Sequence, residues 1–471
     1  MHPDAHALRP LPAHPLLRPD HQVLAGLLAD WRIDDVECAL GDFTSLARGK
    51  RRRASDFLAA AGCRLPTVML GMGLTGGSPM EVFGSILPQA YQDLQLVPDA
   101  TSLRRRPGRR REATVLCEPA GQWHAPRYGR LLQAAELSPR AALRRVLQAY
   151  AAQGLAVKAA PEMEFFLLSR QPEGLGSAKP WRDAPVQETA CEQYSLERAS
   201  HFDAYFDELY GAADTLGIPL AGHLHEAAFS QFEVNFHPGE PLAQADAVFR
   251  FKRLAREVAA RHGFLASFAA KPFLDQPGTG MHWHFSVQRT GADWPHLFAQ
   301  PDGRSSPELL HFLAGLQAGG PAAMAWAAPH DMSFDRVRHS DSSPTHADWG
   351  EDDRHAAFRI PASDAAGRRV ENRLPGGDAN PYLVVAATLA LGLDGLQAGQ
   401  PARAGRDAAP ALPRSLPAAL DALEGSDALR RWFGDPLIDL FVALQRHEHH
   451  ERHAAADPRA AWDLRHLIEL A

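Results

Sequence analysis

Apolar residues recur at helical spacing in four stretches of the chain. In residues 138–153, an apolar stripe follows Ser138 and Pro139, which suit the N-cap and the first helical position, and it stops before Gly154. The same periodicity predicts three further helices, at residues 201–217, 240–263 and 380–396.

Other stretches have the pattern of strands, so the chain as a whole is predicted to be an α+β protein. We expect a strand at residues 154–169, two strands around a tight loop at 220–236, and a strand that follows a glycine turn at 278–287. Between residues 30 and 130, short apolar runs alternate with Gly, Pro and charged residues, which favours a small strand-rich domain. Residues 1–27 lack periodicity and are expected to form a mobile extension.

Length and composition restrict the class of protein. The chain has 471 residues, enough for more than one domain, because a single core usually stops growing near about 250–300 residues. A net charge of -7 argues against a nucleic-acid-binding protein. No apolar run reaches the roughly 18 residues of a membrane span, and the four widely spaced cysteines form no CxxC pair. We therefore expect a cytoplasmic protein with reduced thiols.

Two glutamates, Glu162 and Glu164, lie one residue apart in the strand predicted at 154–169. Alternate residues of a strand share a face, so the two carboxylates project together and need a counter-charge. Lys or Arg partners would satisfy them in a purely structural role. Further acids and imidazoles occur nearby in predicted strands and in a later segment: Glu226, Glu233, His282, His284 and Glu371. An oxygen-rich set without sulfur favours Mg²⁺ or Mn²⁺ over zinc.

A series of arginines surrounds the last of these acids: Arg336, Arg354, Arg359 and Arg373. The fixed guanidinium fork binds carboxylates and phosphates in bidentate fashion. Acids and arginines together point to a metal-bound polyphosphate beside an anionic substrate, the parts that phosphoryl transfer requires. A P-loop fold is excluded because its GxxxxGKS/T sequence is absent. Taken singly, each arginine is better explained as a surface ion pair.

Six segments resemble, in order and spacing, the motifs of the glutamine synthetase family: PEMEFFLL, HEAAFSQFEVNF, ADAVFRFKRLAREVAARHGFLASFAAKPF, GTGMHWHFS, AAFRIP and RVENRLPGGDANPYLVVAATLALGLDGL. The resemblance begins near residue 130 and runs to the C-terminus, with a weaker N-terminal part where LARGK is similar to another family motif. It implies a β-grasp-like N-terminal domain over residues 28–132. Residues 133–471 would form a catalytic domain with a curved antiparallel sheet and surrounding helices.

Position by position, the resemblance also implies roles for the site residues. One divalent metal is expected to bind Glu162, His282 and Glu371, and a second to bind Glu164, Glu226 and Glu233. The glutamate substrate is expected to contact Gly278, Arg336, Arg354 and Arg373. The ATP phosphates would face Arg354 and Arg359, and the nucleotide would lie along His284 and Ser286. The residues expected to act directly in catalysis are Arg354, Arg359 and Glu371.

The reaction implied by the resemblance transfers the γ-phosphate of ATP to the γ-carboxylate of glutamate, and an amine then displaces phosphate. Two or more Mg²⁺ or Mn²⁺ ions, together with the arginines, would neutralise charge as the bond breaks. Members of the family form hexameric rings, commonly stacked as dodecamers, with active sites between subunits. A homo-oligomer is therefore expected.

The sequence departs from the family around the pocket for ammonium. In ammonia-using members a flap glutamate stands two residues before a proline; here the proline is Pro344 and the glutamate position is Ser342. The Asn and Lys positions of the flap are Met332 and Asp335, and the position of an N-terminal aspartate falls near Gly73. A pocket without these anions has lost the electrostatic reason to hold a small cation.

This pattern is similar to the γ-glutamylpolyamine and γ-glutamylamide synthetase branch of the family. The leading hypothesis is ligation of glutamate to an organic amine, such as a polyamine or a monoamine, whose distal ammonium would meet Asp335, Asp341 or Glu351. One alternative keeps ammonia as the substrate. Another is a catalytically silent paralogue that senses a metabolite or joins an active subunit, but the intact metal ligands argue against it.

A histidine-rich run, RHEHHERH, occupies residues 446–453. It does not match the HExxH zinc motif, and it follows an apolar helical segment. We interpret it as a solvated helix face.

Overall fold

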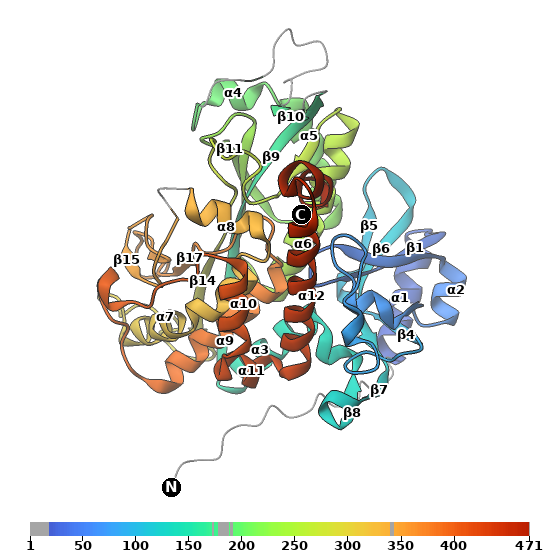
Figure 1. Ribbon diagram of the computed structural model, residues 1–471, viewed down its shortest axis with the longest axis horizontal. Helices are drawn as coiled ribbons and strands as arrows, with labels where there is room; N and C mark the ends of the chain where they lie inside the picture. Colours follow the sequence, from blue (N-terminus) through green and yellow to red (C-terminus); the bar gives the residue numbers. More distant parts are fainter. Residues whose placement is uncertain (1–17, 172–173, 178–187, 189–191, 340–342, 471) are drawn as a thin grey trace.

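The computed structural model of the protein describes residues 18–171, 174–177, 188, 192–339 and 343–470. Two main sheets and the helices around them make up the structure (Figure 1). The N-terminal sheet, drawn in blue and cyan, occupies the right side of Figure 1, and the larger sheet with its helices occupies the rest. This is the α+β architecture that the sequence predicts.

The N-terminal sheet has six strands within the described residues, in the order β2-β1-β6-β4-β3, with β5 beside β6. Strand β1 is parallel to β6 and antiparallel to β2, so the sheet is mixed. Strands β7 and β8 form a separate hairpin. The strands are β1 (Asp35–Gly41), β2 (Ala47–Arg53), β3 (Cys63–Pro66), β4 (Asp93–Pro98), β5 (Arg104–Arg106), β6 (Arg109–Ala120), β7 (Gln122–Ala125) and β8 (Arg130–Gln133).

Residues 18–27 differ from the sequence expectation, because they belong to helix α1 (Arg18–Asp30) and not to a mobile extension. Leu24 and Leu28 lie one helical turn apart and are both buried in the core. Burial of this short stripe accounts for the helix. Residues 1–17 lie outside the described part of the chain, and the domain boundaries at 28 and 132 stay predictions.

The larger sheet has nine strands within the described residues, in the order β11-β12-β9-β14-β17-β16-β15, with β10 and β13 also paired to β9. The strand predictions at 154–169, 220–236 and 278–287 are confirmed by β9, by β11 with β12, and by β14. The strands are β9 (Leu155–Gln171), β10 (Gly174–Ser177), β11 (Leu220–His225), β12 (Gln231–Phe236), β13 (Leu265–Ser267), β14 (Met281–Arg289), β15 (Trp349–Glu351), β16 (Phe358–Ile360) and β17 (Val370–Asn372).

The four predicted helices are confirmed by α3, α5, α6 and α9. Ser138 caps α3, as predicted, by accepting a hydrogen bond from the backbone N–H of Ala141. The helices after α1 are α2 (Ala54–Ala59), α3 (Pro139–Ala152), α4 (Leu196–Ser200), α5 (Asp203–Leu216), α6 (Pro241–Arg261), α7 (Pro307–Ala327), α8 (Asp331–Arg338), α9 (Pro381–Ala398), α10 (Leu416–Glu424), α11 (Asp427–Phe433), α12 (Asp435–Ala454) and α13 (Ile468–Leu470).

Helix α9 is the central helix of the core. It is long and apolar enough to cross a membrane by length and composition alone, yet 78% of it is buried inside the protein. It packs closely on α7 through small residues: a Cβ added at Gly315 would lie 1.9 Å from the carbonyl oxygen of Leu391, and one at Gly395 would lie 2.2 Å from that of His311. The two helices can approach this closely only because glycine lacks a Cβ.

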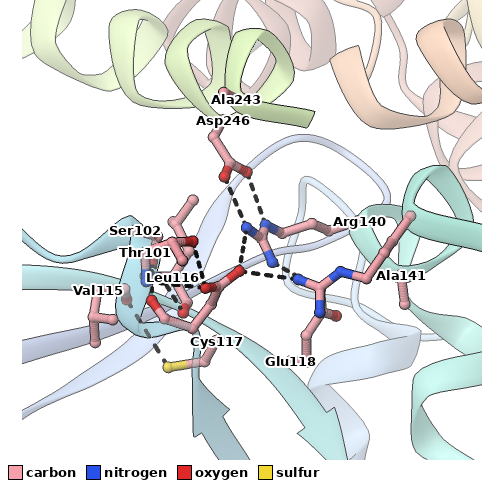
Figure 2. A network of polar contacts seen from close by, with 12 residues as sticks. Thr101, Ser102, Val115, Leu116, Cys117, Glu118, Arg140, Ala141, Ala243 and Asp246 are labelled. Atoms are coloured by element: carbon pink, nitrogen blue, oxygen red, sulfur yellow. Dashed lines mark hydrogen bonds and ion pairs between the residues drawn. The ribbon is translucent and has the colours of Figure 1, made fainter. Parts of the chain in front are cut away.

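A buried arginine joins the N-terminal sheet to the larger part of the protein. Figure 2 shows Arg140 of α3 between Asp246 of α6 and Glu118 of β6. Its guanidinium donates to both Asp246 oxygens at 2.8 Å, to Glu118 at 3.0 Å and to Asp99 at 2.8 Å. Only 4% of the Arg140 side chain is exposed. Arg140 therefore pairs with three carboxylates, two of which, Asp99 and Glu118, also lie near Arg144.

We predict that Arg140→Met destabilises the protein by about 3–5 kcal/mol, because removal of one partner leaves buried charges uncompensated. The measurement is the free energy of unfolding from denaturant titration. Arg130→Met is the matched control, since the Arg130–Glu136 pair is 46% and 29% exposed and should contribute about 1 kcal/mol or less. An equal decrease in the free energy of unfolding in the two variants would show that the buried network stabilises the protein no more than an exposed ion pair does.

Candidate active site

Strand β9 holds the two glutamates of PEMEFF between two partner strands. Antiparallel pairing with β12 sets Glu233 directly opposite Glu164. Pairing with β14 on the other side sets His282 opposite Glu162. Side chains on directly opposite residues lie about 4.5–5.5 Å apart at Cβ, so the sheet register alone brings these four groups together.

The side chains form two groups that could hold a metal ion. One contains Glu162, His282 and Glu371, and the other contains Glu164, Glu233 and His282. Within each group, one ligand atom from each residue lies within 4.8 Å of the others. Glu371 reaches the first group because β17 sets it opposite His284 on β14. The first group is the expected ligand set, and the second contains two of its three expected members.

Glu226, the third ligand expected for the second metal, lies just after β11 and outside that group. Its carboxylate accepts hydrogen bonds from Gln193 Nε2 at 3.0 Å and from the backbone N–H of Ala227 at 2.9 Å. It is nevertheless close enough to act on Glu164: burial, and after it the charge of Glu226, raise the pKa of Glu164 to about 7.

The second group carries an excess of negative charge. Burial and the charges of Glu162 and Glu164 raise the pKa of Glu233 to about 8. Two neighbouring glutamates with raised pKa values mark a place where a cation would relieve both burial and repulsion. Carboxylate oxygens are the ligands that Mg²⁺ and Mn²⁺ prefer. The donor set therefore fits the divalent ions expected for this site.

The first group is better balanced. Although burial opposes it, hydrogen bonds from His282 and His284 lower the pKa of Glu162. Burial and Arg373 lower the pKa of His282 to about 4, which keeps this ring neutral, as a metal ligand must be. Arg369 Nε donates to His284 Nδ1 at 3.2 Å, so the opposite nitrogen carries the proton and donates to Glu162 at 2.9 Å.

Glu371 is completely buried and links the metal ligands to the arginines. Arg359 donates to one of its oxygens at 2.9 Å, and Arg373 donates to the other at 2.5 Å. Arg359 also donates to Asp352 at 2.5 Å. The positions of two cations expected to bind phosphate and glutamate thus depend on one carboxylate.

A cavity of about 600 Å³ adjoins these groups. Its wall includes many of the predicted site residues: Glu164, Glu226, Glu233, Gly278, His282, Arg336, Arg354 and Arg373. A Cβ at Gly278 would lie 2.5 Å from the carbonyl oxygen of Ala270 and 2.9 Å from Arg336 Cγ, so glycine is required beside this arginine. Arg336 itself is buried and donates to the carbonyl oxygens of Leu374 and Arg373 at 3.0 and 3.3 Å.

Five predicted site residues lie outside the cavity wall: Glu162, His284, Ser286, Arg359 and Glu371. Four of them form a connected layer beside it through the contacts described above. Ser286 follows His284 by two residues on β14 and so shares its face of the strand, but its nearest cross-strand partner is Lys158. Its role along the nucleotide stays a prediction.

The structure describes only part of the flap. Ser342 and Asp341 lie outside the described residues. Ser343 lines the cavity, and its hydroxyl donates to the carbonyl oxygen of Arg336 at 3.1 Å. Asp335 is already paired with Arg338 at 2.6 Å and with Arg459 at 2.8 Å, and neither Asp335 nor Glu351 lines the cavity.

The loop around Gly73 lies against α12. A Cβ at Gly73 would lie 2.1 Å from Glu448 Oε1. That oxygen also accepts a hydrogen bond from the backbone N–H of Leu74 at 2.5 Å. Close packing on a buried carboxylate therefore accounts for the glycine, and Gly73 does not line the cavity.

Two residues to which the sequence assigned no role, Lys271 and Gln231, also line the cavity. Lys271 donates to the carbonyl oxygens of Gln276 and His339 at 2.5 and 3.1 Å, which ties its loop to the end of α8. Gln231 donates to Glu164 at 3.3 Å and to the carbonyl oxygen of Gly278 at 2.9 Å. Each lies within one of the six motifs given above, where it is a polar residue among apolar neighbours. That contrast was the sequence signal that could have identified them.

Residues 136–463 match the family model described as the catalytic domain of glutamine synthetase. This is more than half of the chain, and the protein belongs to the glutamine synthetase family.

The relatives include enzymes that act on different amines, according to their names. A γ-glutamylputrescine synthetase of Escherichia coli is 31% identical over 424 residues, which is 88% of each chain. A glutamate–isopropylamine ligase of a Pseudomonas species is 30% identical over 370 residues, or 78% of each chain. A solved structure of a GmaS/ADP complex superposes with a TM-score of 0.75 at 26% identity, covering 94% of this chain and 98% of the other.

The raised pKa values predict an unusual pH dependence for the metal-free protein. A folded-state pKa of about 8 for Glu233, against an ordinary value of 4.5, means that the folded protein binds more protons than the unfolded chain between these values. Its contribution to stability is therefore lost as pH rises through that window. Between about pH 5 and pH 8, the free energy of unfolding should fall less in Glu233→Gln than in the wild type. The expected difference between the two falls is on the order of a few kcal/mol.

The measurement is denaturant unfolding in the presence of a chelator at several pH values. Glu81→Gln, at an exposed position, is the control and should follow the wild-type curve. The same Glu233→Gln protein should bind Mn²⁺ more weakly than the wild type. If its unfolding profile and its Mn²⁺ affinity both matched the wild type, Glu233 would be neither strained nor a ligand.

Proposed function

We propose that this protein is an ATP-dependent ligase that joins the γ-carboxylate of glutamate to an organic amine. The observation that carries the proposal is the pair of metal-ligand groups, joined through His282, beside a cavity lined by arginines. Metal ligands suit a polyphosphate, and guanidinium groups suit the carboxylates of glutamate. The names of the two curated relatives support the amine as acceptor.

The proposed roles of the cations follow their positions. Arg336 and Arg373 bind the carboxylates of glutamate, because both line the cavity and are held by backbone or by Glu371. Arg354 and Arg359 face the ATP phosphates, and Arg354 also contacts the glutamate side of the cavity. The ligands of the two divalent ions are Glu162, His282 and Glu371 for the first, and Glu164, Glu226 and Glu233 for the second.

In the first step, a γ-carboxylate oxygen of glutamate bonds to the γ-phosphorus of ATP, and the bond to the ADP oxygen breaks. When bound, the divalent ions neutralise charge on the β- and γ-phosphates. The arginines hold the two anionic substrates together at the distance that this attack requires. In the second step, the amine nitrogen bonds to the acyl carbon, phosphate leaves, and the nitrogen releases its proton to water.

The rim of the cavity supports an organic amine over ammonia. Tyr194 and Leu274 line it with 59% and 49% of their surface exposed. The ring of Tyr194 and the side chain of Leu274 offer apolar contact to the hydrocarbon part of an amine, a part that ammonia lacks. Asp275, in the same wall, is placed to receive a second ammonium group if the amine has one.

The family relationship also supports a cytoplasmic homo-oligomer, a hexameric ring or a dodecamer, in which active sites form between subunits. Sedimentation of the purified chain measures the oligomer directly.

We predict that, with Mg-ATP and glutamate, at least one organic amine supports phosphate release with kcat/KM more than about tenfold above that for ammonia. A tenfold ratio corresponds to about 1.4 kcal/mol of transition-state binding, which a few apolar contacts provide. The assay compares ammonia with a panel of mono-, di- and polyamines. Glu164→Gln should abolish turnover with every amine, since it removes a metal ligand.

Two results would point to the other functions. Efficient turnover with low concentrations of ammonia, and none with organic amines, would identify an ammonia-using glutamine synthetase. Binding of ATP without turnover on any amine would identify a sensing paralogue.

A further inference from the structure

The histidine-rich run of α12 meets an acidic residue from a distant part of the chain. His449 and His453 lie four residues apart, so they share one face of the helix. Asp331, the first residue of α8, approaches His449, whose Nδ1 lies 2.9 Å from both carboxylate oxygens. One ligand atom from each of the three residues lies within 4.8 Å of the others. The sequence could not reveal this group, because Asp331 is 118 residues away from His449.

The three donors differ in kind from those of the active site. Two imidazoles and one carboxylate form a nitrogen-rich set, which suits Zn²⁺ and similar transition metals and not Mg²⁺. Zinc ligands lie about 2.0–2.2 Å from the ion, so tetrahedral donors are roughly 3.3 Å apart. The three ligand atoms lie within 4.8 Å of one another, so the side chains have to move closer by up to about 1.5 Å to reach this spacing. His453 is exposed, which leaves room for water as a fourth ligand.

The orientation of His453 fits this role. Its Nδ1 lies 2.8 Å from the carbonyl oxygen of His449. A carbonyl can only accept, so Nδ1 carries the proton and Nε2 of the neutral ring keeps a lone pair. A ring nitrogen that donates to a backbone carbonyl while the other binds metal is the usual arrangement of ligating histidines.

Neighbouring charges on the same helix are already paired. Arg452 donates to both oxygens of Asp463 at 2.7 Å. Glu451 accepts from Thr75 at 3.1 Å and lies 3.4 Å from His447. Arg452 thus forms its ion pair with Asp463, and the carboxylate of Asp331 contacts His449. The expectation of a solvated helix face is confirmed for Arg446, His450 and His453, which are exposed, and is wrong for Glu448 and Arg452, which are buried.

We propose that Asp331, His449 and His453 bind one transition-metal ion of the Zn²⁺ class, separate from the ions of the active site. The ion replaces the proton shared by His449 and Asp331 and joins α12 to the first turn of α8. Arg336 lies five residues further along the same short helix and lines the active-site cavity. Metal binding at this site therefore fixes the helix that carries a substrate-binding arginine.

The test is a titration of the full-length protein with Co²⁺ in the presence of excess Mg²⁺, which fills the oxygen-rich sites. We expect one equivalent of Co²⁺ per chain to give the visible absorption of a low-coordinate nitrogen and oxygen site, and stoichiometric Zn²⁺ to displace it. His453→Ala and Asp331→Asn should each weaken Co²⁺ binding at least about tenfold, since loss of even an outer partner of a ligand costs about 10–100-fold. His453→Ala should keep turnover in Mg²⁺ alone, because His453 lies on α12 and does not line the active-site cavity.

Two matched variants make the outcome decisive. His450→Ala removes an exposed histidine of the same run that is not in the group, and it should bind Co²⁺ like the wild type. Glu233→Gln alters the active site and should also keep the signal. Loss of the signal in Glu233→Gln would assign the ion to the active site. Absence of a signal in the wild type, or equal losses in His450→Ala and His453→Ala, would overturn the proposal.

Discussion

The pairing of β9 with β12 and β14 is the constraint on which the active site depends. This register forces Glu162, Glu164 and Glu233 to share one face, although their charges repel. The opposite face of β9 fixes the register, because Met163 and Phe165 are completely buried there, and each large side chain so buried contributes about 1.5–3 kcal/mol. A slip of β9 by one residue would expose both and turn Glu162 and Glu164 into the core. Apolar packing on one face therefore offsets the electrostatic cost on the other.

Buried charge is handled in two opposite ways in this protein. Around Arg140, each carboxylate has a guanidinium partner at hydrogen-bond distance, and the network joins the N-terminal sheet to α3 and α6 (Figure 2). Around Glu164 and Glu233, the protein leaves negative charge in excess, so the pKa values rise. The first arrangement stabilises the fold. The second arrangement favours binding of a divalent cation. The folded protein should therefore be most stable when metal occupies this site.

Local patterns were enough to predict the elements that carry the site, and the family resemblance supplied the members of the two ligand groups. Capping residues and periodicity located α3, α6 and α9, and alternation located β9, β12 and β14. Contacts between distant segments were beyond this reasoning. Glu226 lies outside the second ligand group, and its carboxylate accepts hydrogen bonds from Gln193 and Ala227. Lys271 closes a loop onto His339, 68 residues away. Helix α1 was missed because its buried stripe is too short to stand out from a polar segment.

Helix α8 shows how these long-range contacts connect the site to the rest of the molecule. Its side chains face three environments within six residues: Asp331 contacts α12, Met332 packs in a small core with Leu74 and Trp462, and Arg336 lines the cavity. Ser333 donates to the buried Asp378 at 2.7 Å, and this hydrogen bond ties α8 to the segment just before α9. A displacement at any of these contacts moves a short, rigid helix as a unit. The position of Arg336 is therefore set as much by α12 and the C-terminal segment as by the strands that hold the metal ligands.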